Sequence, residues 1–460
     1  MDVSAYLGSL KDKRIGVVGF GVSNQPLVGA LLDAGCDVTV CDRRERAALG
    51  AAGERAAARG AKMQLGDGYL DRLDFDVIFR TPGLLPTAPE LVQAARRGAV
   101  LTSEMEAFCA LSPCRILAIT GSDGKTTTST VTAEVLKAAG HTVHLGGNIG
   151  TPLFTRLPEI RPDDLAVLEL SSFQLHSMRC RPAVAVITNV SPNHLDVHPD
   201  FADYVAAKQN IYRNQGPEGV LVLNAGDAHT PQFAAEAPGE VRLFSSAGAV
   251  ENGVYLQDGV IYRARGGETA PIMNAADIRI PGAHNVENYM AAFAALGDLA
   301  SREACVSVAK AFPGVPHRME LIRELNGVRF YNDSIASSPT RAIAGLHALP
   351  KPPIILLGGH DKHIPFDELG DKVCLHAKAA VLCGETAEPI AAAIRASKHY
   401  DPKALPVVVL DDFRAAVETA YRLARPGDIV TLSPACSSFD RFKNFEERGN
   451  TFRAIVESLE

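Results

Sequence analysis

The sequence lacks the features that mark several classes of protein. Its 46 Lys and Arg residues are outnumbered by 53 Asp and Glu residues, which gives a net charge of −7 and argues against a nucleic-acid-binding protein with a basic face. No stretch approaches the roughly 18 consecutive apolar residues of a membrane span. The apolar stretch 15–20 is too short for a signal peptide. We therefore expect no nucleic-acid partner, no membrane span and a cytoplasmic location.

Closely spaced cysteine pairs are also missing. Nine cysteines are scattered through apolar segments, and no two have the C-x-x-C spacing of a zinc site or a redox couple. This pattern predicts buried, reduced thiols. Internal repeats and low-complexity runs are absent as well. With 47% hydrophobic and 22% charged residues, the composition is that of an ordinary globular protein.

Short runs rich in Val, Ile and Leu alternate along the chain with stretches of helical periodicity. Continuous apolar runs are typical of strands buried on both faces, and strands that alternate with helices form parallel sheets. The predicted fold class is therefore α/β. At roughly 150 residues per domain, the length suggests about three domains. Breaks near 111–113 and 312–316 predict boundaries that give domains 1–111, 112–313 and 314–460, and residues 245–279 predict small antiparallel strands within the second.

The strongest local signal is the loop Gly-Ser-Asp-Gly-Lys-Thr at 121–126, which follows a predicted strand and opens a predicted helix. Its glycines allow backbone N–H groups to converge on phosphate oxygens, and the helix N-terminus adds partial positive charge. Lys125 would then reach the outer phosphates of a nucleotide, and the Thr126 hydroxyl would ligate Mg²⁺. The first glycine of the full G-x-x-x-x-G-K-[ST] motif is missing. An ordinary strand-to-helix turn is the alternative.

A second glycine loop follows the first predicted strand. Gly19 and Gly21 match the start of a dinucleotide-binding fingerprint, and Asp42 ends the second strand where a ribose-binding acid is expected. Asn24, however, stands in place of the third glycine. The pattern is thus compatible with NAD or with another ligand of a Rossmann-like domain. The basic residues after Asp42 face an anionic ligand or begin a solvated helix.

Polar residues follow three buried runs of the middle segment. Glu169 ends one of them, where it either ligates Mg²⁺ beside the phosphate loop or caps the next helix. His194 follows the next run, and imidazole is a standard metal ligand. Lys208 on a later helix is uninformative by itself. Asn285 and Asn288 share a helix face, which suits a nucleotide base or a cap equally.

Three predicted strands of the last third also end in small or polar residues. Asp333 follows the first, a Gly-Gly-His-Asp-Lys stretch that ends at Lys362 follows the second, and 433–440 follows the third. Such strand ends are typical of a Rossmann-like sheet with a binding edge. Alternatively, Asp333 and Lys362 simply form an ion pair.

Together these motifs resemble the Mur ligase family, the ATP-dependent amino-acid ligases of peptidoglycan synthesis, over essentially the whole chain. The resemblance implies a UDP-binding Rossmann-like domain, a central P-loop ATPase domain and a C-terminal Rossmann-like amino-acid-binding domain. It also implies ligation of D-glutamate to UDP-N-acetylmuramoyl-L-alanine through an acyl phosphate. The Asp-Asn-Pro-Arg sequence of the diaminopimelate- or lysine-adding member is absent. The motifs that carry the resemblance are TGSDGKTT (120–127), LELSSFQL (168–175), NVSPNHLD (189–196), AAKQNIY (206–212), GAHNVEN (282–288), PHRME (316–320), YNDSIASSPTRA (331–342), GGHDKHIPF (358–366) and LSPACSSFDRFKNFEERG (432–449).

The family resemblance also implies roles for particular residues. Those implied to bind ATP are Gly121, Ser122, Asp123, Gly124, Lys125, Thr126, Thr127, Asn285, Asn288, Arg318 and Asp333. Those implied to bind the UDP substrate are Gly19, Gly21, Asp42, Arg43, Arg44, Thr81, Pro82, Gly83, Asn148 and Ser171. Those implied to bind D-glutamate are Ser337, Lys362, Ser438 and Phe445.

The implied catalytic and metal-binding residues form a smaller set. Lys125, Glu169, His194 and Lys208 are expected to be catalytic, and Thr126, Glu169, His194 and a carbamylated Lys208 to hold two Mg²⁺ ions. Ile335 stands where some members carry a lysine, so that substrate contact is not expected here. We expect a monomer. The alternatives are a folylpolyglutamate synthase, an inactive nucleotide-binding regulator and an NAD dehydrogenase.

Overall fold

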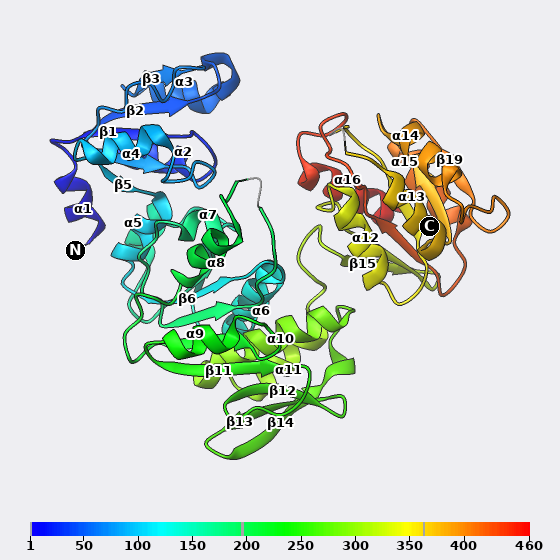
Figure 1. Cartoon of the computed structure of the whole chain (residues 1–460). Helices are drawn as coiled ribbons and strands as arrows, with labels where there is room; N and C mark the ends of the chain where they lie inside the picture. Colours follow the sequence, from blue (N-terminus) through cyan, green and yellow to red (C-terminus); the bar gives the residue numbers. More distant parts are fainter. Residues whose placement is uncertain (1, 195–196, 362–363) are drawn as a thin grey trace. The chain divides into compact units, whose positions relative to one another are not determined.

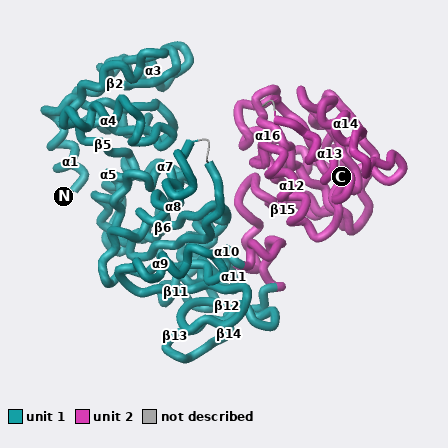
Figure 2. Tube along the Cα trace, in the orientation of Figure 1, with its two compact units in different colours: residues 1–275, 287–308 teal, residues 276–286, 309–460 magenta. Residues whose placement is uncertain are grey.

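The computed structural model describes residues 2–194, 197–361 and 364–460, and Figure 1 shows the whole chain. The chain forms two compact units, shown in Figure 2: the first comprises residues 1–275 and 287–308, and the second comprises 276–286 and 309–460. Each of the three predicted segments holds a sheet of its own. The α/β class is therefore confirmed, and the domain boundaries stay a prediction.

The first sheet of unit 1 has five parallel strands in the order β3-β2-β1-β4-β5. Its buried strands carry the continuous Val- and Ile-rich runs that a sheet covered on both faces requires. The strands are β1 (Arg14–Val18), β2 (Asp37–Asp42), β3 (Lys62–Leu65), β4 (Val77–Arg80) and β5 (Val100–Thr102). The helices of this segment are α1 (Val3–Ser9), α2 (Asn24–Asp33), α3 (Gly50–Ala58), α4 (Pro89–Arg96) and α5 (Glu104–Leu111).

The second sheet of unit 1 has the order β14-β13-β12-β11-β10-β9-β6-β8-β7. Its parallel part consists of β6 (Arg115–Thr120), β7 (Val143–Gly147), β8 (Leu165–Glu169), β9 (Val184–Ile187), β10 (Val220–Asn224) and β11 (Glu240–Ser245). Antiparallel pairing joins β12 (Gly253–Gln257), β13 (Val260–Arg265) and β14 (Glu268–Asn274), which confirms the small antiparallel strands predicted for 245–279. The helices are α6 (Lys125–Ala138), α7 (Ser172–Leu175), α8 (Phe201–Gln209), α9 (Thr230–Glu236), α10 (Ala283–Leu296) and α11 (Arg302–Ala311).

Unit 2 contains the third sheet, in the order β15-β16-β20-β17-β18-β19. All its pairings are parallel except the β15–β16 hairpin. Its strands are β15 (Glu320–Leu325), β16 (Val328–Asn332), β17 (Ile354–Leu357), β18 (Ala379–Leu382), β19 (Val407–Val409) and β20 (Ile429–Leu432). Its helices are α12 (Pro339–Ala348), α13 (Asp367–His376), α14 (Ala387–Ala396), α15 (Phe413–Leu423) and α16 (Phe445–Ser458).

All nine cysteines are free; seven are buried, as predicted, whereas Cys109 and Cys374 are half-buried. Among residues 2–194, 197–361 and 364–460, no helix combines the length and the hydropathy needed to cross a bilayer. The strand order decides where function is expected. In an open parallel sheet, ligands bind beyond the carboxyl ends of the strands, and the neighbours β8, β6 and β9 bring three predicted site segments to one edge.

Candidate active site

The phosphate loop has the strand–loop–helix geometry that the sequence predicts, with β6 leading in and α6 leading out. Gly121 and Gly124 have φ angles of +154° and +79°, which side chains with a Cβ rarely adopt. A Cβ on Gly121 would lie 1.8 Å from Thr188 Oγ1, and one on Gly124 would lie 2.1 Å from Asn288 Oδ1. Both positions therefore require glycine, because of the backbone conformation and because a Cβ would have no room.

Two lysines converge on this loop. Lys125 Nζ donates to the carbonyl oxygens of Gly121 (3.0 Å) and Ser122 (2.9 Å). Lys208 Nζ, on α8, donates to the same Gly121 oxygen at 2.7 Å although the side chain is only 1% exposed. Burial, and then the charge of Lys125, lower the pKa of the Lys208 ammonium well below its usual value. The structure thus gives significance to a lysine that the sequence pattern alone leaves uninformative.

Glu169 lies at the end of β8, next to the phosphate-loop strand, and is 1% exposed. Its Oε1 accepts a hydrogen bond from Asn148 Nδ2 at 2.9 Å, and its buried Oε2 has no hydrogen-bond partner among the described residues. The alternative that Glu169 caps the next helix is wrong, because Ser171 caps α7 in a capping box with Gln174. A buried carboxylate oxygen without a partner suits a cation such as Mg²⁺.

His194 follows β9 and is exposed, with a left-handed φ of +56°. The adjoining segment is fastened to the phosphate loop: Ser122 Oγ donates to Ser191 O at 2.9 Å, and Thr188 Oγ1 donates to Asp123 O at 2.6 Å. The structure therefore brings the segments of Lys125, Glu169, His194 and Lys208 to one edge of one sheet, as the family resemblance implies.

A cleft of about 470 Å³ opens beside the phosphate loop within unit 1. Asp123 and Asn189 line it near the loop, and Asp227 and Glu287 line it farther away. Its size falls within the range of small-molecule sites. Asn288 approaches α6, where Thr128 Oγ1 lies 3.4 Å from Asn288 Oδ1.

The amino-terminal glycine loop is built differently from a dinucleotide fingerprint. The buried side chain of Asn24 donates from Nδ2 to Gly19 O at 2.7 Å, so it holds the turn where a third glycine would leave space. Asp42 accepts hydrogen bonds from Phe20 N (2.6 Å) and from Arg44 Nε and Nη2 (both 2.9 Å). Burial opposes ionisation of Asp42, but these donors outweigh it and lower the pKa to about 2. An acid so engaged is not available to a ribose in the way that an NAD site requires.

The turn at 81–83 lies against this loop. Thr81 N donates to Val18 O at 2.8 Å, and a Cβ on Gly19 would lie 2.7 Å from Thr81 Cβ. Gly19, Asp42 and Thr81 thus share the carboxyl edge of β1, β2 and β4. Arg43 is exposed beside them. The structure does bring most of the predicted UDP-binding residues together.

In unit 2, Asp333 is buried directly after β16. Its Oδ1 accepts from Met319 N (3.2 Å) and its Oδ2 from Ser433 Oγ (2.9 Å). Burial raises the pKa of Asp333 to about 7. Arg318 N donates to Val315 O in the turn before β15, and Asn285 Nδ2 donates to Pro281 O.

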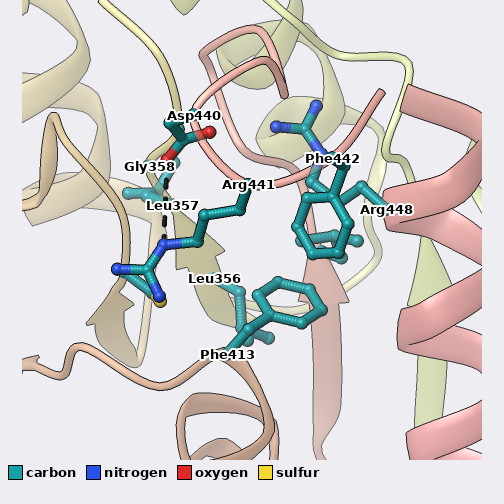
Figure 3. Close-up of a pocket in the computed structure, with 11 residues that line it drawn as sticks. Leu356, Leu357, Gly358, Phe413, Asp440, Arg441, Phe442 and Arg448 are labelled. Atoms are coloured by element: carbon teal, nitrogen blue, oxygen red, sulfur yellow. Dashed lines mark ion pairs between the residues drawn. The ribbon is translucent and has the colours of Figure 1, made fainter. Parts of the chain in front are cut away.

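The loop after β20 is held by Arg448, a buried arginine of α16 that the sequence analysis does not single out. Its guanidinium donates to Ser334 O at 2.9 Å, Cys436 O at 3.1 Å and Ser437 O at 3.1 Å. Figure 3 shows it at the wall of a small pocket with Asp440 and Arg441, which form an ion pair. Arg448 therefore links two strand ends that carry predicted D-glutamate-binding residues.

The predicted D-glutamate-binding residues have distinct surroundings. Ser438 is buried, and its carbonyl accepts from Phe442 N at 2.8 Å. Phe445 begins α16, and its carbonyl accepts from Ser334 Oγ at 2.7 Å. Ser337 lies before α12 and is half-buried. Lys362 lies outside the described residues, so its predicted role and its possible pairing with Asp333 remain predictions.

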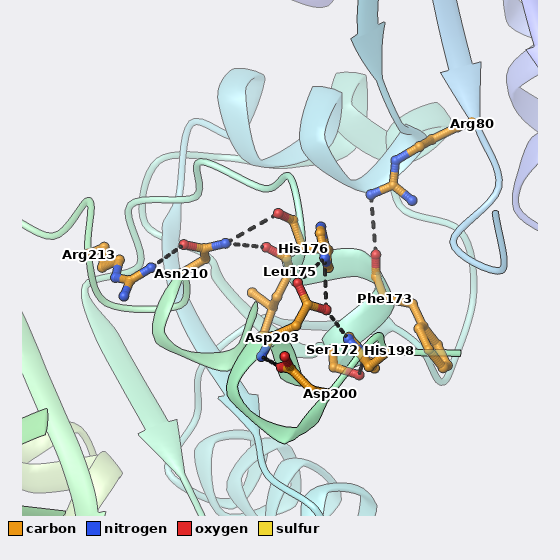
Figure 4. A network of polar contacts seen from close by, with 10 residues as sticks. All are labelled: Arg80, Ser172, Phe173, Leu175, His176, His198, Asp200, Asp203, Asn210 and Arg213. Carbon is orange, nitrogen blue, oxygen red and sulfur yellow. Dashed lines mark hydrogen bonds and ion pairs between the residues drawn. The ribbon is translucent and has the colours of Figure 1, made fainter. Parts of the chain in front are cut away.

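Sequence reasoning misses two further features of unit 1, both visible in Figure 4. Arg80 is 1% exposed at the end of β4 and donates to Phe173 O (3.2 Å) and Ser177 Oγ (2.7 Å), so it joins the first sheet to α7. A charged residue that ends an apolar strand is the signal that could have revealed it. The second feature is a cluster of His176, His198 and Asp203, whose ligand-type atoms lie within 4.8 Å of one another.

The three sheets, the glycine loop and the buried lysine and carboxylate beside it define an α/β protein with a P-loop-type nucleotide-binding domain. Comparison with known proteins gives the same result. The family descriptions "Mur ligase middle domain" and "Mur ligase, glutamate ligase domain" match residues 119–296 and 317–436. A protein of Acetivibrio thermocellus named UDP-N-acetylmuramoylalanine--D-glutamate ligase is 48% identical over 98% of this chain and 97% of its own.

Solved structures show the same fold. The MurC ligase of Thermotoga maritima has a TM-score of 0.59 at 17% identity and covers 97% of this chain and 99% of its own. The MurF ligase of Thermotoga maritima, solved in complex with ADP, has a TM-score of 0.55 at 17% identity and covers 98% of this chain and 96% of its own. The chain belongs to the Mur ligase family.

Proposed function

We propose that this enzyme ligates D-glutamate to UDP-N-acetylmuramoyl-L-alanine at the expense of ATP, in peptidoglycan synthesis. The observation that carries this proposal is the full-length similarity to a D-glutamate ligase, at 48% identity. The edge of the second sheet supports it, since Lys125, Glu169 and Lys208 meet there around one phosphate loop. Membership of the family argues against the dehydrogenase and the non-catalytic regulator. The extent of the match over both ends of the chain argues against a folylpolyglutamate synthase.

The reaction proceeds in two steps. The γ-phosphoryl group of ATP passes to the alanyl carboxylate, which gives an acyl phosphate and ADP. The amine of D-glutamate then attacks the carbonyl carbon, and the tetrahedral intermediate collapses to the amide with loss of phosphate and a proton. Phosphoryl transfer needs positioning and charge neutralisation more than covalent chemistry from the protein. Lys125 supplies positive charge at the transferred group, and the backbone N–H groups of 121–126 hold the phosphates.

Thr126, Glu169 and His194 are the residues that would hold Mg²⁺, with Lys208 as a carbamate. The fit rests on Glu169, whose buried Oε2 has no hydrogen-bond partner among the described residues. Bound Mg²⁺ would neutralise charge on the phosphate oxygens. Two such ions are proposed, as the family resemblance implies.

Carbamylation of Lys208 requires a neutral amine that adds to CO₂. Burial at 1% exposure and the nearby charge of Lys125 favour that neutral form, because both lower the pKa of the ammonium. A carbamate would convert a cation beside Lys125 into an anion able to ligate a metal. This chemistry explains why a lysine is placed in so unfavourable an environment.

The remaining site residues are proposed from the family resemblance. The UDP-substrate residues are Gly19, Gly21, Asp42, Arg43, Arg44, Thr81, Pro82, Gly83, Asn148 and Ser171, and the nucleotide contacts beyond the loop are Asn285, Asn288, Arg318 and Asp333. D-Glutamate is assigned to Ser337, Lys362, Ser438 and Phe445. We further propose a cytoplasmic monomer.

The test is release of phosphate from ATP with UDP-N-acetylmuramoyl-L-alanine and Mg²⁺, in the presence of D-glutamate, L-glutamate or no amino acid. We expect release only with D-glutamate. Equal release with L-glutamate would refute the proposed preference for D-glutamate, and no release with either amino acid would refute the proposed ligase activity. Lys125→Ala should lower the rate of release by about 10²–10³-fold, whereas Lys137→Ala should not, because Lys137 is an exposed lysine at the far end of the same helix.

A further inference from the structure

The loop that carries His194 has an unfavourable backbone. His194 adopts a left-handed φ of +56°, which costs free energy in any residue with a Cβ. Its carbonyl accepts hydrogen bonds from the N–H groups of Val197 (3.1 Å) and His198 (2.9 Å). These two hydrogen bonds tie the backbone of His194 to that of Val197 and His198.

His198 is held by hydrogen bonds at both ring nitrogens. Its side chain is 0% exposed. Because the Asp203 carboxylate can only accept, Nδ1–H of His198 donates to Asp203 Oδ2, at 2.6 Å. Nε2 lies 3.0 Å from Ser172 Oγ on α7 (Figure 4). Asp203 belongs to the first turn of α8, so His198 ties α7 and α8 to the loop between them.

The ring of His198 also lies in a row of aromatic side chains. The Phe173 ring stacks on it with centroids 5.4 Å apart and meets the His194 ring edge-on at 5.0 Å. On the other side, the Tyr204 ring meets His198 edge-on at 5.2 Å, and Tyr204 Oη lies 2.9 Å from Ser122 Oγ in the phosphate loop. An unbroken chain of contacts therefore runs from His194 to the phosphate loop through His198.

The same row reaches the buried lysine. Lys208 Nζ lies 4.6 Å from the centroid of the Tyr204 ring, so the ring contacts the buried lysine side chain. Asp203 is anchored a second time, because His176 Nε2 donates to its two oxygens at 3.0 and 3.1 Å. Hydrogen bonds thus engage both oxygens of Asp203, and Oδ2 accepts from both His176 and His198.

We propose that His198, held by Asp203 and Ser172, is a positioning residue for the metal centre of this enzyme. It fixes His194 and Lys208 relative to the phosphate loop without touching substrate or metal. The inference rests on the proposed function, in which His194 and Lys208 serve the cations. Outer-shell groups that orient metal ligands typically change metal affinity or activity 10- to 100-fold when removed.

The test compares His198→Phe with a matched control, His144→Phe. The control removes another buried histidine of unit 1, which belongs to the edge strand β7 and whose Nε2 lies 2.9 Å from Asp164 Oδ2. The measurements are kcat, the half-saturating Mg²⁺ concentration, Mn²⁺ binding in the presence of ADP by electron paramagnetic resonance, and the melting temperature. Asp203→Asn, which keeps the size of the side chain, provides a second variant if His198→Phe does not fold.

We expect His198→Phe to raise the half-saturating Mg²⁺ concentration and weaken Mn²⁺ binding about tenfold or more. Asp203→Asn should shift both in the same direction. His144→Phe should lower only the melting temperature. Unchanged metal dependence in both loop variants, or an equal shift in the control, would overturn the proposal.

A further experiment distinguishes the positioning role of His198 from direct binding of a metal ion by the His176–His198–Asp203 cluster. Enzyme treated with EDTA should regain full activity with Mg²⁺ alone, and a requirement for Zn²⁺ would overturn the proposal. If the wild-type enzyme released no phosphate, the proposed function would fail. The Mn²⁺–ADP measurement would still decide the role of His198.

Discussion

Asp333 offers a quantitative test because it is a buried carboxyl group with few compensating contacts. Its two hydrogen-bond donors are Met319 N and Ser433 Oγ, and burial raises its pKa to about 7 from 3.8. Asparagine has the same shape and imitates the protonated acid: its Oδ1 can accept from Met319 N while its Nδ2 donates to Ser433 Oγ. Asp333→Asn therefore removes the cost of burying the charge and leaves the packing unchanged.

The direction in which the free energy of unfolding changes with pH follows from proton linkage. Between pH 3.8 and about 7, the folded chain keeps a proton on Asp333 that the unfolded chain has lost. The free energy of unfolding contributed by this group therefore falls as pH rises through that window. From pH 5 to pH 7, two pKa units correspond to about 3 kcal/mol. Above pH 7 the loss is nearly complete, so Asp333→Asn should gain about 3 kcal/mol relative to the wild type between pH 5 and pH 8.

The assay is urea-dependent hydrogen exchange of peptides from β16, at pH 5 and pH 8. Exchange within β16 reports on unit 2 alone, which avoids treating the whole chain as one cooperative transition. Asp428→Asn is the control. Burial opposes ionisation of Asp428, but its hydrogen bond from Lys378 lowers its pKa overall. That carboxyl is ionised at both pH values, so its substitution should destabilise unit 2 equally at each.

A difference between Asp333→Asn and the wild type that stays constant from pH 5 to pH 8 would refute this reasoning. So would an asparagine variant that is less stable than the wild type at pH 8. Because Asp333 is a proposed nucleotide contact, we also expect the stabilised variant to turn over more slowly. Gain of stability with loss of rate is the usual result when a strained functional group is relieved.

Three further predictions concern the phosphate loop and the buried lysine beside it. Lys125→Ala should lower kcat by about 10²–10³-fold, the usual effect of removing one charge-stabilising donor, with a melting temperature close to that of the wild type. Gly121→Ala should abolish ADP binding by calorimetry, because its Cβ would lie 1.8 Å from Thr188 Oγ1, whereas Gly8→Ala, with open space around it, should bind normally. Carbon-13-labelled bicarbonate should give a carbamate signal in the nuclear magnetic resonance spectrum of the wild type that is missing from Lys208→Ala; a signal of equal intensity in both would refute the modification.

The active-site motifs could be recognised in the sequence where the residues that form a site are close together in the chain. The loop at 121–126 needs only a strand end, two glycines and a helix start, all within six residues. The placement of Glu169 beside that loop required one added assumption, that its strand neighbours β6. The antiparallel strands within 245–279 were likewise predicted from polar–apolar alternation alone and are confirmed.

Other questions stayed open because their answers depend on which side chains contact one another in the folded chain. Whether the first glycine loop suits NAD depends on Asn24 filling the third-glycine space and on Arg44 engaging Asp42. Whether Glu169 is a helix cap or a ligand depends on Ser171 taking the cap. Ser171 and Gln174 do have the S-x-x-Q spacing of a capping box, whereas the contact of Arg44 with Asp42 depends on side-chain direction, which spacing does not indicate.

The sequence by itself determined the α/β class, the phosphate loop and the family, since these depend on periodicity, on turn residues and on motifs that are contiguous in the chain. Only the tertiary structure decided which polar groups are buried and what they touch. Arg80 meets Phe173 across 93 positions of the chain, and Lys208 reaches Gly121 across 87. The pKa shifts of Lys208 and Asp333 arise from that burial, because desolvation depends on all the atoms packed around a group and not on its neighbours in sequence.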